Sequence, residues 1–247
     1  MSTHRFYARP LVVLAFALVV KPALAQEADG TPLSVELALT SDYRFKGQSQ
    51  SDRSYAVQSY VRYDHDSGAF ISLWTSAGLA PSKYALTEID PTLGYTYEFS
   101  KGASTTISAS YFWSHGPSRA KDGYFEGAMA YTRKFRWAEF SAELSYSPNY
   151  SYHSGHAWGI SSGAERPLKF AGVTWLTASA HFGYQWIDNH KAYGTPNWIF
   201  YDLGLTATWK QFALDARFAG TNTEDVNCFR GSNLCDGGAL LTLSATI

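Results

Sequence analysis

Hydrophobic and polar side chains alternate along residues 34–64 in two runs that flank a polar bend. Side chains of a β-strand point alternately to opposite faces, so each run predicts a strand with one apolar and one polar face. Residues 47–52, Gly-Gln-Ser-Gln-Ser-Asp, have the composition of a turn, and the two strands are therefore predicted to form an antiparallel hairpin. The apolar side chains of the first strand are Val35, Leu37, Leu39, Tyr43 and Phe45. Only Ser41 interrupts this apolar face.

Similar runs recur along the rest of the chain. The clearest is 137–146, where Phe140 and Leu144 share a face opposite to Glu139 and Glu143. The Gly- and Ser-rich run 157–164 has the weakest alternation. Twelve runs are predicted as strands: 34–46, 55–64, 69–75, 92–99, 105–113, 124–135, 137–146, 157–164, 173–186, 198–209, 212–220 and 239–247.

The connections between these runs alternate in length. The short ones are 64–68, 100–104, 134–136, 165–172 and 210–211. The long ones are 47–54, 76–90, 114–123, 147–156, 187–197 and 219–238. Short turns at one rim, long loops at the other and an even strand count are typical of an outer-membrane β-barrel. A soluble sandwich or a lipocalin has no reason to sort its loops in this way.

Aromatic residues near the predicted strand ends agree with this interpretation, because amphipathic rings settle at the boundary between membrane and water. They are Tyr43, Phe45, Trp74, Trp113, Trp137, Trp186, Trp198 and Trp209. The sheet must close, since an open edge finds no hydrogen-bond partners in lipid. The predicted fold is therefore all-β, a closed antiparallel up-and-down transmembrane β-barrel of about 12 strands.

The first 25 residues have the features of an export signal. Arg5 and Arg9 form a basic start, an apolar run follows, and Ala23-Leu24-Ala25 provides a small-residue cleavage site. The apolar run is too short for a spanning helix, which needs about 20 apolar residues. We therefore expect a signal peptide at 1–25 and the barrel at 26–247.

Charge and cysteine content narrow the possible partners. Without the signal, 17 basic residues stand against 21 acidic ones, a net charge of −4, which does not favour nucleic acid as a partner. The two cysteines, Cys228 and Cys235, lie close together in an exported chain and predict one short-range disulfide. No second cysteine pair completes a zinc site.

The run Leu39-Thr40-Ser41-Asp42-Tyr43-Arg44-Phe45-Lys46-Gly47-Gln48-Ser49-Gln50 resembles the opening signature of the TorF-like porin family, T-S-D-Y-x-F-[RK]-G-x-S-Q. The pair Cys228 and Cys235 before the last strand is also similar. The resemblance implies an outer-membrane barrel of porin type and names no solute. One departure is the C-terminus, Ser244-Ala245-Thr246-Ile247, because such barrels commonly end in an aromatic residue.

The polar parity of the strands is predicted to line the lumen. Mixed charges there would set up a transverse field that filters solutes, although polar residues that only solvate or brace the interior are expected in any such barrel. Asp42, Arg44 and Arg62 are the strongest candidates, because they belong to the signature or lie beside it. The predicted pore-lining residues are Glu36, Asp42, Arg44, Gln58, Arg62, Glu98, Glu139, Glu143, Asp202, Asp215 and Arg217.

The strand number sets the size of the lumen. Twelve tilted strands give a backbone diameter of about 24 Å and, after side chains, an opening of roughly 10–14 Å unless a loop folds inward. Such an opening is compatible with passage of small solutes.

Catalytic and metal-binding patterns are weak. Gly159-Ile160-Ser161-Ser162-Gly163 matches G-x-S-x-G, but Glu165-Arg166-Pro167 offers no following helix, as a nucleophile elbow requires. His153 and His156 share a predicted loop without further ligands, which is more typical of surface residues than of a metal site. His181 is a conceivable base on the wall, with no serine–acid partner assignable.

We therefore expect a porin in the outer membrane of a Gram-negative bacterium, a passive diffusion channel for small hydrophilic solutes. Its other expected partners are outer-membrane lipid and lipopolysaccharide, and we expect no enzyme activity, cofactor or metal. Two alternatives stay open. One is a membrane-embedded lipid hydrolase that uses a wall histidine and a serine, and the other is a non-conducting structural or adhesion barrel with an occluded lumen.

Overall fold

The computed structural model describes residues 32–79, 86–116, 119–168 and 175–247. The expected signal peptide, residues 1–25, lies outside the described residues. Among the residues described, no helix is long and apolar enough to cross a membrane.

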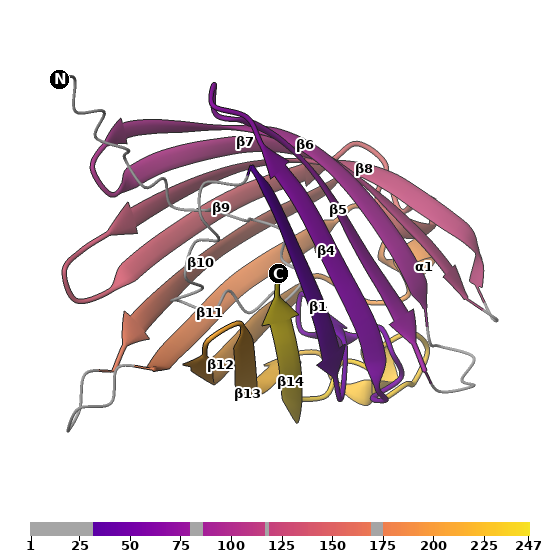
Figure 1. Ribbon diagram of the computed structural model, residues 1–247. Coiled ribbons are helices and arrows are strands. Elements are labelled where there is room, and N and C mark those ends of the chain that lie inside the picture. The colour runs from indigo at the N-terminus through magenta and orange to yellow at the C-terminus, as the bar shows by residue number, and fades with distance from the viewer. Residues whose placement is uncertain (1–31, 80–85, 117–118, 169–174) are drawn as a thin grey trace, which may run out of the picture.

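Within the described residues, twelve long strands form a closed antiparallel barrel, as predicted (Figure 1). Neighbours in the chain pair with one another, and β1 closes the ring against β14, where Leu39 faces Leu243. The barrel strands are β1 Leu33–Thr40, β4 Ala56–Asp64, β5 Ala69–Gly78, β6 Thr87–Ser100, β7 Ala103–Gly116, β8 Arg119–Lys134, β9 Glu139–Ser147, β10 Ala157–Pro167, β11 Leu176–Ile187, β12 Trp198–Trp209, β13 Phe212–Thr221 and β14 Gly238–Thr246.

The barrel places apolar side chains outside and polar ones inside. On β13, Phe212, Leu214 and Phe218 are exposed, whereas Asp215 and Arg217 are buried. The other strands repeat this alternation, with exposed leucines and aromatic rings on the outer face. Soluble proteins show the opposite distribution, and a barrel whose outer face contacts hydrocarbon is expected to show this one.

Several strands are longer than predicted at the end that carries the long loops. β6 begins at Thr87 rather than 92, so Glu88 and Asp90 belong to the wall and not to a loop. β7 ends at Gly116 and β8 begins at Arg119, where a longer loop over 114–123 was expected. The start predicted for the ninth run at Val173 lies outside the described residues, and β11 begins at Leu176.

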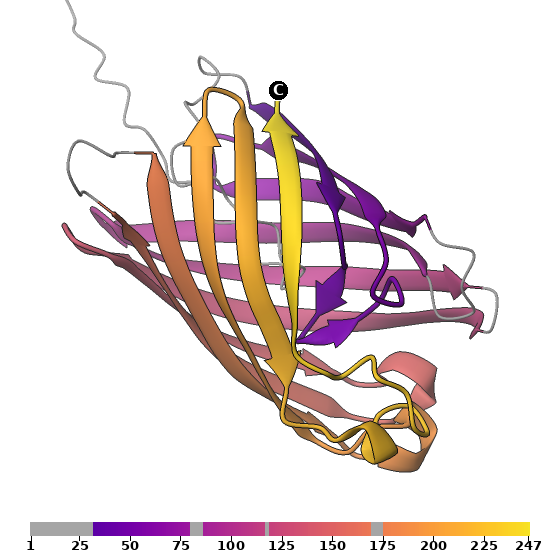
Figure 2. The ribbon, with the colours of Figure 1, turned by 90° about the horizontal axis from the view of Figure 1, so that it is seen from below.

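The predicted first hairpin is wrong in one respect. β1 ends at Thr40 and does not continue to residue 46; the next residues turn inward and form two short strands, β2 Arg44–Phe45 and β3 Gln48–Ser49 (Figure 2). Tyr43 and Phe45, expected to face lipid, are only 3% and 8% exposed because they pack inside the barrel. The chain leaves the wall at Ser41, the position that broke the apolar parity.

The aromatic residues divide into two groups. Trp113, Trp137, Trp186 and Trp209 are exposed on the outer face, as expected of a girdle. Trp74 and Trp198 are buried inside instead, which corrects their predicted position, because the inward-folded residues cover them.

The long connections carry short helices. They are η1 Ser151–His153, α1 His190–Tyr193 and η2 Asp225–Asn227. The predicted disulfide between Cys228 and Cys235 is present in the last of these connections and has a Cα–Cα distance of 5.9 Å.

Candidate functional site

Residues 41–54, which we call the inner segment, fold into the barrel at the end that carries the long loops. Phe45 pairs with Gln48 across a two-residue turn, Lys46-Gly47, whose φ angles are 47° and 80°. Two positive φ values are the pattern of a type I′ hairpin turn. A Cβ atom at Gly47 would lie 2.3 Å from the Gly220 carbonyl oxygen on β13, so only glycine fits between the inner segment and the wall.

Asp42 organises the inner segment from within. Its carboxylate accepts hydrogen bonds from Arg44 Nε at 2.7 Å and from Ser49 Oγ at 2.6 Å, and it lies 3.3 Å from Ser51 Oγ. Ser51 Oγ also accepts from the Tyr43 backbone N–H at 2.8 Å. These bonds join both sides of the hairpin, and they explain the use of a carboxylate and two hydroxyl groups at these spacings.

Arg44 fixes the inner segment to the last strands. Its side chain is buried, and Nη1 donates to the carbonyl oxygens of Gly47 at 3.0 Å, Ala219 at 3.2 Å and Asp236. The Ser49 backbone N–H donates to the Leu234 carbonyl at 2.8 Å. The inner segment is therefore held to β13 and to the disulfide-closed loop that follows it.

Other contacts of the inner segment reach the walls on the far side. Tyr43 Oη donates to Glu88 on β6 at 2.9 Å, and Lys46 Nζ donates to Glu126 on β8 at 3.0 Å. Lys46 Nζ also donates to Gln185 on β11 at 2.8 Å, and Trp198 Nε1 on β12 donates to the Lys46 carbonyl at 2.9 Å. β6 lies directly opposite β12 in the ring of strands, so the inner segment spans the lumen.

An aromatic cluster packs around the inner segment. Phe45 contacts Phe112 with a centroid distance of 5.6 Å, and Tyr43 contacts Trp74 at 5.0 Å. Tyr150 and Tyr193 from two long connections join at 5.5 Å, which brings the loops into the same cluster. The lumen at this end is thus filled in the manner of a soluble protein core.

Two phenols of this cluster have altered acidity. Burial, and next the Glu88 carboxylate, raise the pKa of Tyr43 well above its usual range. Burial likewise raises the pKa of Tyr150. Both phenols therefore stay neutral, and Tyr43 remains a hydrogen-bond donor to Glu88.

A second polar network lies on the inner face of β11, β12 and β13. Arg217 donates to Asp202, to Asp215 at 3.0 Å and to Ser179 at 3.0 Å. His181 Nδ1 lies 2.8 Å from Asp202 Oδ1. The histidine is thus part of an inner-face ion network rather than of the lipid-facing surface that a lipid hydrolase would need.

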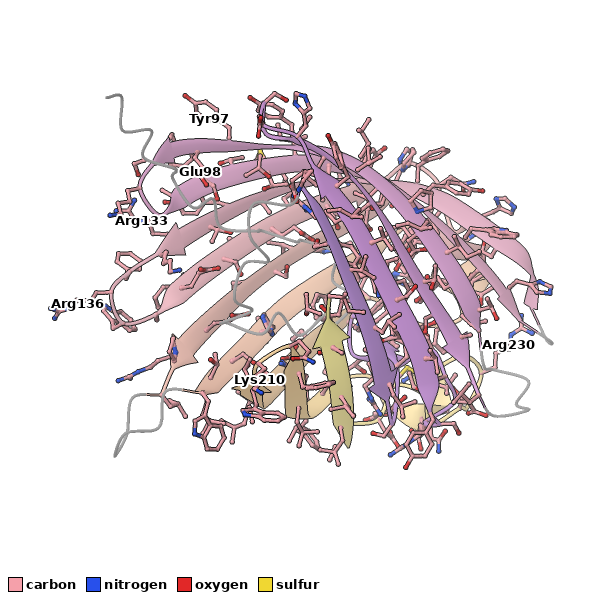
Figure 3. All side chains as sticks on the ribbon, viewed as in Figure 1. Tyr97, Glu98, Arg133, Arg136, Lys210 and Arg230 are labelled. Carbon is pink, nitrogen blue, oxygen red and sulfur yellow. A yellow bond between two sulfur atoms is a disulfide. The ribbon has the colours of Figure 1, made fainter. Side chains whose placement is uncertain are left out.

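The predicted pore-lining residues fall into three places. Asp42 and Arg44 lie in the inner segment and not in the wall, and Glu98 is exposed at the short-turn end of β6, opposite to the end that carries Arg230 (Figure 3). Arg62 binds Asp64 by bonds of 2.6–2.9 Å and stacks 3.7 Å from the Phe70 ring centroid. The remaining residues occupy the inner parity of their strands: Glu36, Gln58, Arg62, Glu139, Glu143, Asp202, Asp215 and Arg217.

Sequence reasoning missed Lys46 within the inner segment and, around it, Glu88, Asp90, Glu126 and Gln185. Glu126 carried a usable signal, since the exposed Phe125, Met129 and Tyr131 of β8 alternate with it. Gln185 and Lys46 carried none, because their contact joins residues 139 positions apart.

Metal and nucleophile patterns gain little from the structure. In the described part of the chain, no group of three or more His, Cys, Asp or Glu residues is placed to hold a metal ion. His153 and His156 bond to Asn149 and Tyr146 respectively. Gly159–Gly163 lies entirely within strand β10, which excludes the strand-to-helix turn of a nucleophile elbow.

Comparison with known proteins gives a family and a fold. The model of a family described as "Bacterial protein of unknown function (Gcw_chp)" matches residues 25–247. No curated protein sequence matches the chain. The structure is similar to the NanC porin, with a TM-score of 0.57 and 9% identity over 86% of this chain and 98% of that one. It is also similar to the KdgM porin, with a TM-score of 0.52 and 10% identity over 86% and 97%.

Proposed function

We propose that this chain, which belongs to the Gcw_chp family, is a porin-like channel of the bacterial outer membrane whose mouth is closed down by the inner segment. Small hydrophilic solutes cross it by passive diffusion when the inner segment moves out of the lumen. Residues 40–50, which resemble the TorF-like porin signature, build this constriction, and the TorF-like assignment is part of the same proposal.

Two features support a channel. The inner face is polar and charged along the strands, whereas the outer face is apolar, so the barrel suits hydrocarbon outside and water inside. A twelve-stranded barrel also has room for a small-solute path beneath a constriction. The structure of the similar KdgM porin has been solved "in complex with disordered oligogalacturonate".

The observation that carries the proposal is the position of the inner segment. It bonds to Glu88 and Glu126 on one side of the barrel and to Trp198 and Ala219 on the other. A segment that spans the lumen through charged side chains both narrows the path and selects what passes. We propose the predicted inner-face residues as pore-lining, with Asp42 and Arg44 at the constriction.

The outer face defines the expected surroundings. Exposed leucines and aromatic residues on every side would contact outer-membrane lipid, including lipopolysaccharide in the outer leaflet. The loop connections would then face the cell exterior, and the short turns the periplasm.

Conductance of the folded protein in planar lipid bilayers tests the channel. Gly47→Val introduces a Cβ atom that collides with the Gly220 carbonyl, so the inner segment must leave its place. We expect small or rare openings for the wild type and at least fivefold more conductance for Gly47→Val. Gly68→Val is the matched control, because Gly68 also has a positive φ and a backbone oxygen 2.5 Å from the added Cβ, yet lies in a short turn.

A second candidate is a non-conducting structural barrel, which the aromatic cluster around the inner segment favours. The same recordings separate the two. Heat-dependent gel migration verifies that both proteins are folded. If neither the wild type nor Gly47→Val then conducts, the channel is rejected and the structural barrel is supported.

A further inference from the structure

The Lys46 ammonium group is surrounded by polar and aromatic side chains inside the barrel. Glu126 Oε2 on β8 and Gln185 Oε1 on β11 accept its hydrogen bonds at 3.0 and 2.8 Å. The Tyr150 ring lies 5.6 Å from Nζ, within the range of a cation–π contact. Carboxylate, amide oxygen and aromatic face together form the surroundings that an ammonium group prefers.

The backbone places this lysine at a conformational cost. Lys46 is the first residue of the type I′ turn and has a φ of 47°, where asparagine, aspartate or glycine is normally preferred. A residue with a Cβ atom loses stability in this left-handed region, because the Cβ atom lies too close to a backbone carbonyl oxygen. The contacts of the ammonium group offset that loss, so the residue is placed for its charge rather than for the turn.

The surrounding wall carries two further buried carboxyl groups, Glu143 and Asp90, near Lys46 and Glu126. Glu143 lies close enough to interact electrostatically with Glu126 and Lys46, and Asp90 interacts with Glu88 and Glu126. Glu143 is 8% exposed and Asp90 is 6% exposed. In the described part of the protein, Glu143 Oε2 and Asp90 Oδ1 have no hydrogen-bond partner, although buried carboxylate oxygens normally have one.

A cavity of about 20 Å³ beside this group has room for one water-sized group, such as a primary ammonium head group. Asp90 lines it together with the rings of Trp74, Phe112 and Tyr60 and the hydroxyl of Ser110. Arg62 also lines it, but its charge is taken up by Asp64. A carboxylate with an unbonded oxygen between aromatic rings suits an organic ammonium group better than a neutral solute.

We infer that the carboxylates of Glu126, Glu143 and Asp90 form a lumenal binding site for small organic cations with primary ammonium groups, part of which Lys46 occupies as a tethered counter-ion. A free amine competes with Lys46 for Glu126 and, by displacing it, loosens the inner segment. The inference deepens the proposed function and rests on it for the access of solutes to the lumen.

Titration of the folded, detergent-solubilised protein with 1,4-diaminobutane tests the site, with 1,4-butanediol as the neutral control. Isothermal calorimetry measures binding without any need for conductance. Lys46→Met removes the tethered charge at similar length, and we expect the diamine to bind at least tenfold more tightly than to the wild type. The diol should bind to neither protein.

A pair of variants on one strand makes the test specific. Glu143→Gln should weaken diamine binding at least fivefold, in both the wild-type and the Lys46→Met background. Glu139→Gln is the matched control, because Glu139 shares β9 and its inner parity but lies at the short-turn end. It should leave binding unchanged.

Equal affinity of the wild type and Lys46→Met, or equal weakening by Glu143→Gln and Glu139→Gln, would overturn the inference. If Lys46→Met does not fold, the two glutamate variants still decide it. Channel conductance without diamine binding rejects the site and leaves the channel. Diamine binding by a barrel that does not conduct in bilayers, either as the wild type or as Gly47→Val, upholds the site and rejects the channel.

Discussion

Asp42 and Arg44, two residues apart in the inner segment, form a buried ion pair with an Nε–Oδ2 distance of 2.7 Å. The pair joins the internal bonds of the hairpin to the carbonyl groups of β13. It therefore connects the shape of the inner segment to its attachment on the barrel wall.

Asp42→Ala should release the inner segment from β13. Removing one partner of a buried ion pair leaves the other charge uncompensated and costs about 3–5 kcal/mol. We expect the amide of Gln50, which donates to the Tyr43 carbonyl at 2.7 Å, to lose its protection from hydrogen exchange. Asp188→Ala, an exposed aspartate in a long connection, should leave that protection unchanged. Full protection of Gln50 in Asp42→Ala would contradict the role given to the pair.

Tyr43→Phe should destabilise the barrel mouth by about 1–3 kcal/mol. The substitution removes the donor to Glu88 and leaves a buried carboxylate oxygen without that hydrogen bond. Denaturant unfolding followed by tryptophan fluorescence measures the change, since the Trp74 ring lies 5.0 Å from Tyr43.

Tyr55→Phe is the control for this measurement, because Tyr55 is exposed on the outer surface. An equal loss of unfolding free energy in the two variants would show that the Tyr43 hydroxyl has no special role.

Most of the barrel could be predicted from the sequence because strand alternation is local. The apolar parity of β9, β12 and β13 follows directly from residues such as Phe140, Leu203 and Leu214, and the strand count follows from the runs. The disulfide could also be predicted, since the exported chain has only two cysteines.

The inner segment could not be predicted in the same way. Tyr43 and Phe45 keep the parity of β1, so a strand that continues and a hairpin that turns inward share one local pattern. Only long-range contacts, such as Lys46 with Glu126 and Gln185, distinguish them. Asp90 was missed for a local reason, because Pro91 lacks an N–H and interrupts the regular pairing of β6 with β7.

Leu203→Arg tests the lipid-facing surface. Leu203 is exposed near the middle of β12, and a charged side chain at the bilayer midplane costs about 2–4 kcal/mol. Unfolding free energies measured in lipid vesicles should fall by that amount. Tyr97→Arg makes a comparable change near the short-turn rim (Figure 3), where the cost should drop to about 0–1 kcal/mol. Equal costs at the two positions would argue against a membrane-embedded β12.

Replacing both cysteines by serine should loosen the inner segment while the barrel remains folded. The disulfide closes a short loop, and the loop-entropy relation gives a stabilisation of about 2.5 kcal/mol for this length. The loop presents the carbonyl groups of Leu234 and Asp236 to Ser49 and Arg44. We expect faster hydrogen exchange at the Ser49 amide in the double variant.

Exchange at β6 and β7 amides in the same sample provides the internal reference for the cysteine variant. A uniform increase in hydrogen-exchange rate over the whole barrel would indicate global destabilisation, and it would contradict a local stabilising role of the disulfide.

The attachment of the inner segment to β13 and to the loop before β14 has a consequence for biogenesis. Residues 41–54 are among the first of the barrel to be synthesised, yet Gly220, Ala219 and Asp236, against which they rest, are among the last. The inner segment can therefore take its place only after the C-terminal strands have been synthesised and β1 has paired with β14. In an incompletely assembled chain the inner segment does not close the barrel mouth. Unfinished copies therefore differ in structure from finished ones.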